Sequence, residues 1–388
     1  MSGPTIFMSC AEASGDHHAS ELIRSLRKRY PDARFVGAAG PKMQAEGCEC
    51  IVDLTQQAAM LGSIFTKIFY FRRQVKKLQA AIREIQPDVL VPVDSPALNW
   101  HLCRVAKKVN VPVMYYVAPQ VWAWAPWRIK KVRKFTDHIA CLLPFEEEYF
   151  RSRGVNATYV GHPLFDQLPP QRDESECPSL PEAWMSGEWN IAMLPGSRAG
   201  EIGKLTGPFV QTARAIRGRW PKAKITFTAV DETAKERILA AAGEAAGELT
   251  IVVAQTPETL ANAHFALAAS GTVTLEVAHF GVPMVIAYNV GAIQKFLYRL
   301  IVRHLFRIKL LTLVNIVAGR GVVPELMPWI PSQEVLDETV LRELEDYGTL
   351  SHTRKTLLNI TKPLAVEPPR KASDNIADLV ANLIDTDQ

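Results

Sequence analysis

The side chains best suited to chemistry include a stretch of small and hydroxyl residues, Ser270–Glu276, which follows the apolar run Phe265–Ala269. Backbone N–H groups at such a strand-to-helix turn are free to bind a phosphate, which the helix dipole favours. Glu276 comes one turn later, where a carboxylate can accept hydrogen bonds from both hydroxyls of a ribose. The alternative is an ordinary helix start. The candidate nucleotide-binding residues here are Ser270, Gly271, Thr272 and Glu276.

A second turn of the same kind, Leu194–Glu201, follows the strand-like run Trp189–Met193. Gly196 permits a tight bend, and Arg198 can hold a diphosphate by paired, charge-assisted hydrogen bonds. The turn adds Ser197, Arg198 and Glu201 to the candidate nucleotide contacts. Neither turn fits the dinucleotide fingerprint GxGxxG or the P-loop GxxxxGK[ST], so those ligands are disfavoured and a sugar nucleotide remains open.

Asp94 is the candidate general base, because it follows the clean strand-like run Val89–Val93. Ligands of such sheets bind beyond the carboxyl ends of the strands. Partial burial there would raise the pKa of a carboxyl group toward a range useful for accepting a proton from a substrate hydroxyl. The alternative is a helix N-cap for the segment that begins at Pro96.

The first strand-like run, Thr5–Ser9, ends in another polar turn, Cys10–His18, where Glu12 and Ser14 could contact substrate. The adjacent His17 and His18 would point in different directions on a helix, and no further ligands complete a set, so no metal site is predicted. A Ser-His-Asp hydrolase is also disfavoured, because no G-x-S-x-G motif is present.

An aromatic segment, Tyr115–Trp124, is followed by the basic stretch Trp127–Lys131. Flat aromatic faces beside cations suit sugars, acyl chains or phosphates, whereas core packing is the competing interpretation. Gln120, Trp122 and Arg128 are the candidate contacts in this segment.

These residues need a scaffold, and both halves of the chain alternate strand-like runs with amphipathic helices. The pattern predicts an α/β protein of two doubly wound, Rossmann-like domains facing a cleft. The predicted domains are residues 1–168 and 189–369, with a proline-rich linker at 169–188. A final helix, 370–388, is expected to pack back on the first domain. The predicted strands are 5–9, 34–37, 88–93, 111–116, 138–142 and 157–160, then 189–194, 224–228, 249–253, 265–269 and 283–287.

Composition is compatible with two large cores, since 48% of the 388 residues are hydrophobic. The six cysteines are scattered and only Cys48 and Cys50 lie close, which predicts reduced thiols rather than zinc. The N-terminus lacks a basic signal-peptide region, and no apolar run is long enough to span a bilayer. A cytoplasmic protein is therefore expected.

The net charge of +4 is unevenly distributed, because residues 54–83, 95–136 and 277–324 contain no Asp or Glu. The first stretch places Leu61, Ile64, Phe65, Ile68, Phe69 and Val75 at helical spacing beside Lys67, Arg72, Arg73, Lys76 and Lys77. The third does the same with Phe296, Leu297, Leu300, Ile301, Leu305 and Phe306 beside Lys295, Arg299, Arg303 and Arg307. Such helices can lie on an anionic membrane surface, or they can be core helices with solvated basic flanks. No nucleic-acid-binding signature accompanies the charge.

Taken together, the motifs of this chain resemble the lipid A disaccharide synthase family, in order and spacing along nearly its whole length. The motifs are Glu12–Asp16, Val117–Trp124, Pro144–Glu146, Val160–Leu164, Leu194–Arg198 and Ser270–Glu276. The resemblance implies the glycosyltransferase-B fold and a metal-independent enzyme without cofactor, peripherally bound to the cytoplasmic face of the inner membrane. It implies transfer of diacylglucosamine from UDP-2,3-diacylglucosamine to 2,3-diacylglucosamine 1-phosphate, which forms a β-1,6-linked disaccharide and releases UDP.

The same resemblance assigns roles to individual residues. Asp94 matches the family's strand-end aspartate and would take the proton of the acceptor 6-hydroxyl in a single inverting displacement. Glu12 and Asn315 are expected as further catalytic residues, and Arg198 matches the arginine of the diphosphate turn. Residues expected near the acceptor are Ser14, Asn99, Gln120, Trp122, Arg128 and Glu325. Departures from the family pattern include Ala97, where it has an aspartate, and Ala125, where it has an arginine.

Three other interpretations stay open from sequence. The chain could be a UDP-N-acetylglucosamine epimerase or the peptidoglycan glucosaminyltransferase, which share the fold. It could also be a non-catalytic peripheral membrane protein regulated by a nucleotide. The expected partners are a UDP-sugar donor, a lipid phosphate acceptor and an anionic inner membrane surface, without nucleic acid, and the chain could form a homodimer.

Overall fold

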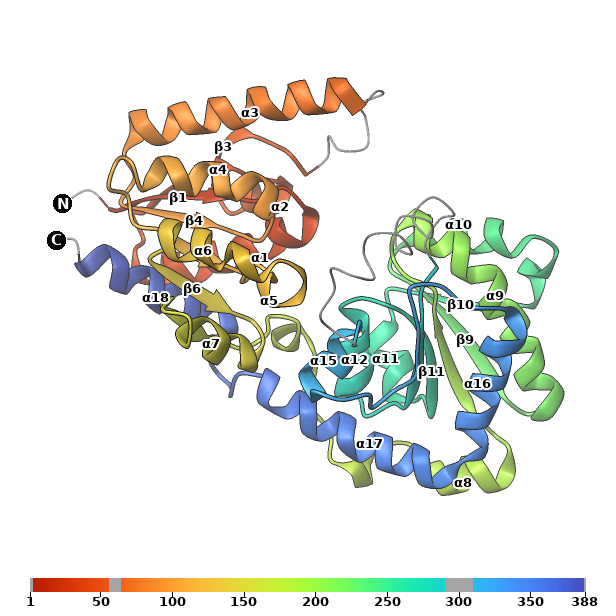
Figure 1. Ribbon diagram of the computed structural model, residues 1–388. Helices are drawn as coiled ribbons and strands as arrows, with labels where there is room; N and C mark the ends of the chain where they lie inside the picture. Colours follow the sequence, from red (N-terminus) through yellow and green to blue (C-terminus); the bar gives the residue numbers. More distant parts are fainter. Residues whose placement is uncertain (1–2, 56–63, 290–309, 387–388) are drawn as a thin grey trace. The chain divides into compact units, whose positions relative to one another are not determined.

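The computed structural model describes residues 3–55, 64–289 and 310–386, which divide into two compact units (Figure 1). Unit 1 contains residues 1–166 and 364–388, and unit 2 contains residues 167–363. The chain therefore changes unit twice, after residue 166 and after residue 363, whereas the sequence predicts domain ends at 168 and 369.

Unit 1 is built on one parallel sheet with the strand order β3-β2-β1-β4, extended by the order β5-β6-β7. Isolated bridges from Leu90 to Val113 and from Val93 to Tyr116 join β4 to β5. The strands are β1 (Thr5–Ser9), β2 (Arg34–Ala38), β3 (Glu49–Val52), β4 (Val89–Pro92), β5 (Met114–Tyr116), β6 (His138–Cys141) and β7 (Ala157–Tyr159).

Helices cover both faces of this sheet, which explains why its central strands are apolar at successive positions. Phe7 and Leu90 face one hydrophobic cluster, together with residues of α3, α4, α6 and α7. Ile6 and Val91 face the other cluster, formed with α1, α2 and α18. The helices of unit 1 are α1 (Ala13–Arg29), α2 (Pro41–Ala45), α3 (Ile64–Ile85), α4 (Pro96–Ala106), α5 (Val121–Trp124), α6 (Ile129–Phe135), α7 (Pro144–Arg151) and α18 (Ala372–Thr386).

The start of α1 approaches the sheet closely. A side chain at Gly15 would lie 3.1 Å from the Cβ of Cys10, so glycine lets the helix pack against the ends of β1 and β4. The next residue, the buried Asp16, accepts the N–H groups of Lys42 and Met43 at 2.9 and 3.0 Å. These bonds satisfy the first N–H groups of α2 and fix that helix beside α1.

Unit 2 repeats the architecture with a parallel sheet of order β10-β9-β8-β11-β12-β13. The prediction of an α/β protein with two doubly wound sheets is therefore confirmed. The strands are β8 (Asn190–Leu194), β9 (Lys224–Ala229), β10 (Thr250–Val253), β11 (Phe265–Ala269), β12 (Met284–Ala287) and β13 (Glu325–Leu326). The helices are α8 (Leu180–Ser186), α9 (Ala199–Arg219), α10 (Glu232–Ala242), α11 (Thr256–Ala261), α12 (Val273–His279), α15 (Leu313–Ala318), α16 (Gln333–Glu345) and α17 (Tyr347–Thr361).

The predicted linker is not irregular throughout, because it contains α8. Ser179 caps this helix by accepting the N–H of Glu182 at 3.4 Å, and Leu180 and Ala183 are buried in the core of unit 2. The proline-rich composition of this stretch concealed a short helix whose apolar face is narrow.

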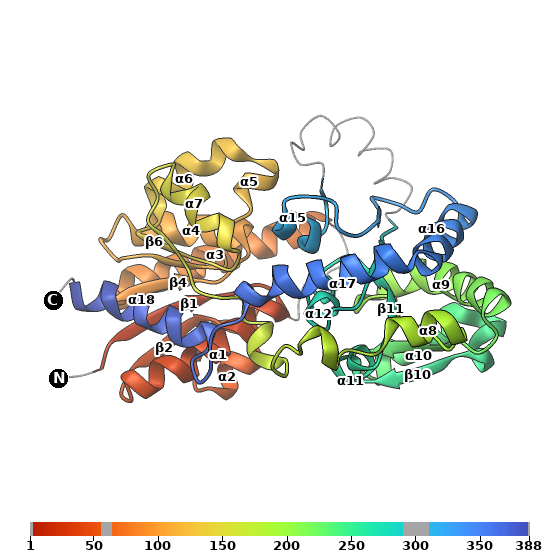
Figure 2. The ribbon, with the colours of Figure 1, turned by 90° about the horizontal axis from the view of Figure 1, so that it is seen from below.

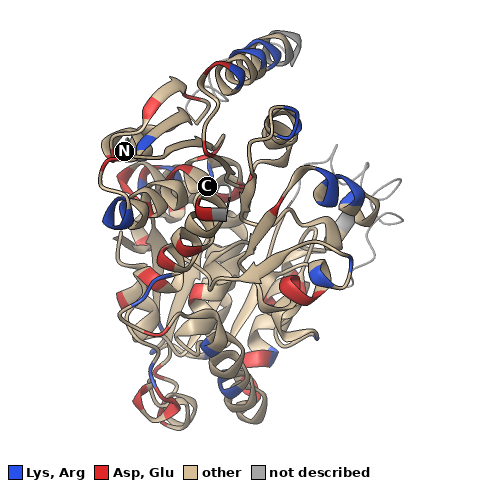
Figure 3. Cartoon of the chain, turned by 90° about the vertical axis from the view of Figure 1, so that its left-hand side faces the viewer, with Lys and Arg blue, Asp and Glu red and all other residues tan. Residues whose placement is uncertain are grey.

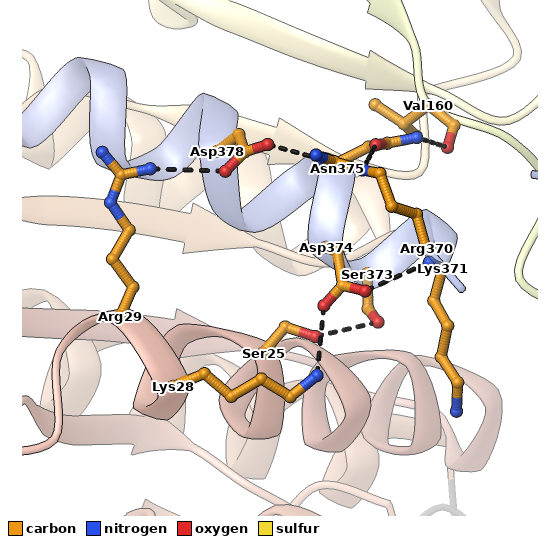
Figure 4. Close-up of polar contacts among 10 residues, drawn as sticks. All are labelled: Ser25, Lys28, Arg29, Val160, Arg370, Lys371, Ser373, Asp374, Asn375 and Asp378. Carbon is orange, nitrogen blue, oxygen red and sulfur yellow. Dashed lines mark hydrogen bonds and ion pairs between the residues drawn. The ribbon is translucent and has the colours of Figure 1, made fainter. Parts of the chain in front are cut away.

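The last helix, α18, packs against α1 in unit 1 (Figures 1 and 2). Its buried residues Ile376, Val380 and Ile384 belong to the same hydrophobic cluster as Leu22 of α1. Polar contacts also hold α18 against unit 1, as Figure 4 shows. They include Ser25 to Ser373 at 3.0 Å, Lys28 to Asp374 at 3.4 Å, Arg29 to Asp378 at 3.3 Å and Asn375 to the carbonyl of Val160 at 3.0 Å.

Candidate active site

Each sheet has one point at which its strand order reverses direction, and ligands of such sheets bind at the carboxyl ends of the strands there. In unit 1 this point lies between β1 and β4, which lead into the turns of Glu12 and Asp94. In unit 2 it lies between β8 and β11, which lead into the turns of Arg198 and Gly271. The turns singled out in the sequence are thus the strand ends at the two switch points.

Asp94 occupies an unusual backbone conformation. Its φ is +48° and that of Ser95 is +42°, a region that costs a non-glycine residue about 1–3 kcal/mol. Three hydrogen bonds hold this turn in place. The carbonyl of Asp94 accepts bonds from Asn99 Nδ2 at 2.6 Å and Tyr115 Oη at 2.8 Å, and its N–H donates to the carbonyl of Tyr116 at 2.9 Å. Strain that the surroundings maintain in this way is typical of functional sites.

The carboxyl group of Asp94 does not cap a helix, because Ser95 is the N-cap residue of α4 and that helix has no side-chain cap. Partial burial raises the pKa of Asp94 above its ordinary value, and the nearby carboxylate of Glu12 raises the pKa further, while the N–H of Ser95 opposes both effects. A carboxyl group with a raised pKa suits the role of general base.

Glu12 and Ser14 are exposed at the start of α1. Glu12 is the N-cap residue, and its side chain makes no capping bond. Its carboxylate is close enough to Asp94 to raise the pKa of that group, so two carboxyl groups lie at the switch point of unit 1.

Asn99 differs from the expectation of an acceptor contact, because it is fully buried. Its Oδ1 accepts a bond from Ser9 Oγ at 2.6 Å, and its Nδ2 donates to the carbonyls of Val93 and Asp94. The amide therefore joins the ends of β1 and β4 and supports the turn of Asp94 from beneath.

The aromatic segment combines core packing with exposed side chains. Tyr115 and Tyr116 are fully buried, as the core-packing alternative has it. Gln120 is exposed, Arg128 is half-buried and Trp127 is 60% exposed. Trp122 is half-buried, donates to Glu146 at 2.9 Å and packs edge-on against Phe145 with ring centroids 4.9 Å apart.

The first turn of unit 2 requires glycine at position 196. The φ of Gly196 is +105°, and a Cβ there would lie 2.7 Å from Glu201 Oε2. Glu201 reaches back to the N–H of Arg198 at 3.4 Å and to its guanidinium at 3.0 Å. The Arg198 side chain is nevertheless 78% exposed, whereas Glu201 is mostly buried. Glu201 thus lies under the turn and orients Arg198, which differs from the expected direct contact with a nucleotide.

The second turn of unit 2 presents Gly271 and Thr272 to solvent. Gly271 has a φ of +152°, and the space around its Cα is open. Thr274 Oγ donates to the carbonyl of Gly271 at 2.8 Å, and the N–H of Ser270 donates to the end of β12. The following helix, α12, has only seven residues, so backbone N–H groups of the turn are better candidates for anion binding than a helix dipole.

Glu276 is half-buried on α12. Burial raises its pKa to about 7, and the carboxylate of Glu258 adds to this effect. A carboxyl group of this kind can accept two hydroxyl donors once it is ionised.

Asn315, predicted as a catalytic residue, and Glu325, predicted near the acceptor, bond each other at 2.7 Å. Asn315 is 1% exposed, and its amide bonds Val322, Val323 and Glu325. Glu325 also accepts the N–H groups of Leu311 and Thr312, both at 3.0 Å. The donors and acceptors of the Asn315 side chain are occupied, so its role in this structure is to hold residues 311–325 together.

Glu146 lies in the family motif Pro144–Glu146, but no role for it is predicted from the sequence. A signal was available, since a Pro at the first helical position followed by Glu two residues later is typical of a helix start whose glutamate accepts backbone N–H groups.

Several sequence predictions fall outside the described residues. They concern Phe296, Leu300 and their neighbours at 290–309, residues 56–63, and the side chains of residues 64–68. Val75, one of the apolar residues of the first basic stretch, is buried in the core, as the core-helix alternative has it. Within the described part of the chain, no group of His, Cys, Asp and Glu could hold a metal ion. The helices described there include none long and apolar enough to cross a membrane.

Sequence comparisons match this chain to lipid-A-disaccharide synthases. The sequence profile of the lipid-A-disaccharide synthetase family matches residues 6–362. A lipid-A-disaccharide synthase of Myxococcus xanthus is 34% identical over 341 residues, which are 87% of this chain and 88% of that protein. One of Geobacter metallireducens is 32% identical over 383 residues, 98% of this chain and 97% of that protein.

Solved structures share the fold at low sequence identity. The co-structure of S. aureus MnaA with UDP superposes with a TM-score of 0.61 at 11% identity and covers 98% of this chain and 96% of its own. Acinetobacter baumannii MurG gives 0.57 at 12% identity, with 98% and 99% covered.

Proposed function

The chain belongs to the lipid-A-disaccharide synthase family, and from that premise we propose how its two units divide the reaction. It is a glycosyltransferase of lipid A biosynthesis. We propose that unit 2 binds the UDP-sugar donor, and that unit 1 binds the lipid acceptor and supplies the general base. The observation that carries this division is the strained, partly buried Asp94 at the switch point of unit 1.

The donor is UDP-2,3-diacylglucosamine and the acceptor is 2,3-diacylglucosamine 1-phosphate. Asp94 accepts the proton of the acceptor 6-hydroxyl while that oxygen attacks the anomeric carbon. The bond from the anomeric carbon to the diphosphate breaks with its electron pair, so UDP leaves and the configuration inverts. The product is a β-1,6-linked disaccharide 1-phosphate.

The charge that develops on the diphosphate is met in unit 2. Arg198 offers paired N–H donors from an exposed position, and the turns at Ser197 and Thr272 offer hydroxyl and backbone N–H groups. Donors of this kind are worth ~2.7–4 kcal/mol each in other enzymes. The Glu276 carboxylate accepts hydrogen bonds from the ribose hydroxyls.

An assay of UDP release tests the proposed function. Diacylated UDP-glucosamine with the lipid acceptor should give UDP, whereas unacylated UDP-glucosamine should give far less. Conversion of UDP-N-acetylglucosamine to its epimer in the absence of an acceptor would identify an epimerase instead. UDP binding without release of UDP from both lipids would indicate a nucleotide-regulated protein.

Unit 1 also carries the surface that we propose for contact with an anionic membrane. In α3, Val75, Leu78 and Ile82 pack into the core, while Phe69 is 74% exposed. Arg72, Arg73 and Lys76 are exposed on the same helix, and Figure 3 shows Lys and Arg in blue along it. Basic side chains beside an exposed aromatic ring are typical of a helix that lies in the membrane interface. We also retain the homodimer as a proposal, to be measured by sedimentation of the purified protein.

A further inference from the structure

Among the residues that the structure describes, the buried carboxyl group of Glu146 has no cationic partner, and it bonds Trp122 of the proposed acceptor site. Glu146 lies in the first turn of α7 and is 3% exposed. Burial raises its pKa to about 7. A carboxylate in the interior is unfavourable unless hydrogen bonds compensate it, so its bonding partners indicate what it does.

Three N–H donors surround Glu146. Its Oε2 accepts the backbone N–H groups of Leu142 and Leu143 at 3.2 and 3.1 Å, and its Oε1 accepts Trp122 Nε1 at 2.9 Å. The first two bonds are local to the start of α7. The third comes from the short helix α5, which lies within the connection 117–128 after β5, called the loop 117–128 below, so it connects two segments that the backbone does not join directly.

The loop held in this way begins beside the proposed base. It runs from Val117 to Arg128 after β5, and the residue before it, Tyr116, accepts the N–H of Asp94. Val117 has a φ of +64°, which is strained for a β-branched residue. The segment between β6 and α7, which contributes Leu142 and Leu143, follows the next strand of the sheet. Three neighbouring strand ends are therefore linked, at Asp94, Trp122 and Glu146.

We propose that Glu146 is a positioning residue for the lipid acceptor, which acts by holding Trp122 and with it the loop 117–128 in a fixed place beside Asp94. The loop carries the exposed side chains of Gln120 and Trp127, which are available to a sugar or an acyl chain. Glu146 itself is too buried to touch substrate. The inference rests on the proposed function, since it takes Asp94 as the base for the acceptor hydroxyl.

The negative charge of the Glu146 carboxylate contributes to this positioning role. All three partners are N–H donors, which an ionised carboxylate satisfies completely. In Glu146→Gln the amide retains one acceptor oxygen, and its NH2 group opposes at least one of the N–H donors. In Trp122→Phe the ring against Phe145 is kept, while the donor to Glu146 is lost. The two changes therefore remove the same bond from opposite sides.

The test is steady-state kinetics of Glu146→Gln, Trp122→Phe and the double variant, with donor and acceptor lipids varied separately. Glu147→Gln is the matched control, because Glu147 lies on the same helix turn but bonds Arg151 and the N–H of Tyr159. Both single variants should raise the KM for the acceptor by ~10-fold, the change expected for one hydrogen bond to a charged group. The donor KM should stay within about two-fold, and the double variant should match the single ones, because both remove one bond.

Other outcomes overturn the inference. If Trp122→Phe alone raises the acceptor KM, Trp122 contacts the lipid directly and Glu146 does not position it. If the donor KM rises equally and the melting temperature falls, the bond only stabilises unit 1. If wild-type protein releases no UDP from the two lipids, the proposed function fails; if it does and Glu146→Gln keeps the wild-type acceptor KM, only this inference fails.

Discussion

Asp94 combines a strained backbone, partial burial and a neighbouring carboxylate, and each of these affects its chemistry differently. The strained turn, fixed by Asn99 and Tyr115, sets where the carboxyl group stands. Burial and Glu12 raise its pKa, so that it holds a proton more readily than an exposed aspartate. A stronger base in a fixed position is what proton abstraction from a sugar hydroxyl requires.

Replacing Asp94 by Asn should lower kcat by ~10²–10⁴, the range typical of losing a general base. Asparagine has nearly the same shape, so UDP affinity in unit 2 should stay within a few-fold. Single-turnover rates and UDP calorimetry on the same preparation check both expectations. Near-normal turnover in a folded Asp94→Asn protein would exclude Asp94 as the base.

Glu12→Gln should move the acid limb of the kcat/KM profile to lower pH. The base must be ionised to work, so activity falls as pH drops through the pKa of Asp94. Removing the Glu12 charge lowers that pKa, and ionised Asp94 then persists to more acidic conditions. Glu21→Gln, elsewhere on α1, is the control and should leave the profile in place. An unchanged acid limb in Glu12→Gln would show that the two carboxyl groups do not interact.

Glu276 should make UDP affinity depend on pH. Only the ionised carboxylate accepts both ribose hydroxyls, and its pKa is about 7, so affinity should rise as pH increases through that value. UDP itself also titrates in this range, so the comparison must be made with Glu276→Gln. The ratio of wild-type to variant affinity should increase by ~10-fold between about pH 6 and about pH 8. A constant ratio would mean that Glu276 does not bind the ribose.

At the scale of elements, the turns after β8 and β11 depend on glycines whose constraints differ. Gly196 has both a left-handed backbone and a close neighbour in Glu201, while the space around Gly271 is open. Because Glu201 orients Arg198, crowding at position 196 would be transmitted to the guanidinium that we assign to the diphosphate.

Gly196→Ala should therefore weaken UDP binding by ~10-fold or more, through strain in the turn and displacement of Glu201. Gly200→Ala is the matched control, because position 200 lies in the first turn of α9 and an added Cβ there would meet no atom within 4 Å. This control variant should bind UDP normally. Calorimetric titration measures both. Equal affinities in the two variants would move the diphosphate away from this turn.

In α3, core-facing and outward-facing residues lie on different sides of the helix, so an outward-facing residue can be substituted to test membrane binding without unfolding the protein. Phe69→Ser should reduce binding to anionic vesicles by ~10-fold, the loss expected for one buried aromatic ring, and added salt should weaken what remains. Met185→Ser, 73% exposed on α8 of unit 2, is the control. Sedimentation with vesicles gives the bound fraction. Equal binding of wild type and Phe69→Ser would remove α3 from the membrane surface.

Sequence patterns predicted the elements whose residues face two apolar layers. The run Thr5–Ser9 coincides with β1, and Phe265–Ala269 coincides with β11, because strands buried on both faces carry runs of consecutive apolar residues. The pattern did not predict β3 (Glu49–Val52), an edge strand with two exposed residues, or the two-residue β13. Short or half-exposed strands depend on their neighbours for hydrogen bonds, and their sequences carry little periodicity.

The candidate site likewise contains residues whose position the sequence predicts and residues whose role it does not. Motifs led to Asp94, Arg198 and Gly271, which lie at the strand ends where a ligand would bind. The same motifs do not distinguish buried supports from exposed groups, so they predict an acceptor contact at Asn99, a nucleotide contact at Glu201 and a catalytic role for Asn315. Whether a polar side chain bonds the backbone of a distant turn or faces solvent depends on tertiary packing, which residue type alone does not reveal.

At the scale of the whole molecule, α18 is the part of the chain that crosses back to complete unit 1. Its stabilising contribution comes mainly from the apolar seam with α1, because the ion pairs around it are exposed and such pairs contribute little.

Ile376→Ala should accordingly destabilise unit 1 by ~2–5 kcal/mol, the range for deleting a buried isoleucine side chain to alanine. Asp378→Asn, on the same helix, loses the pairs to Arg29 and Arg370 and should cost less than ~1 kcal/mol. Urea unfolding followed by tryptophan fluorescence compares them. A larger effect of Asp378→Asn would show that the ion pairs, not the apolar seam, hold α18.

The position of α18 in the sequence has a consequence for synthesis of the protein. Unit 2 is continuous, so it can fold as soon as residues 167–363 have left the ribosome. Unit 1 begins first but must wait for the last segment, and until then Leu22, Ile23 and Leu26 of α1 lack the helix that covers them. The first half of the nascent chain is thus the last to mature, and during that interval it is the part most in need of a chaperone.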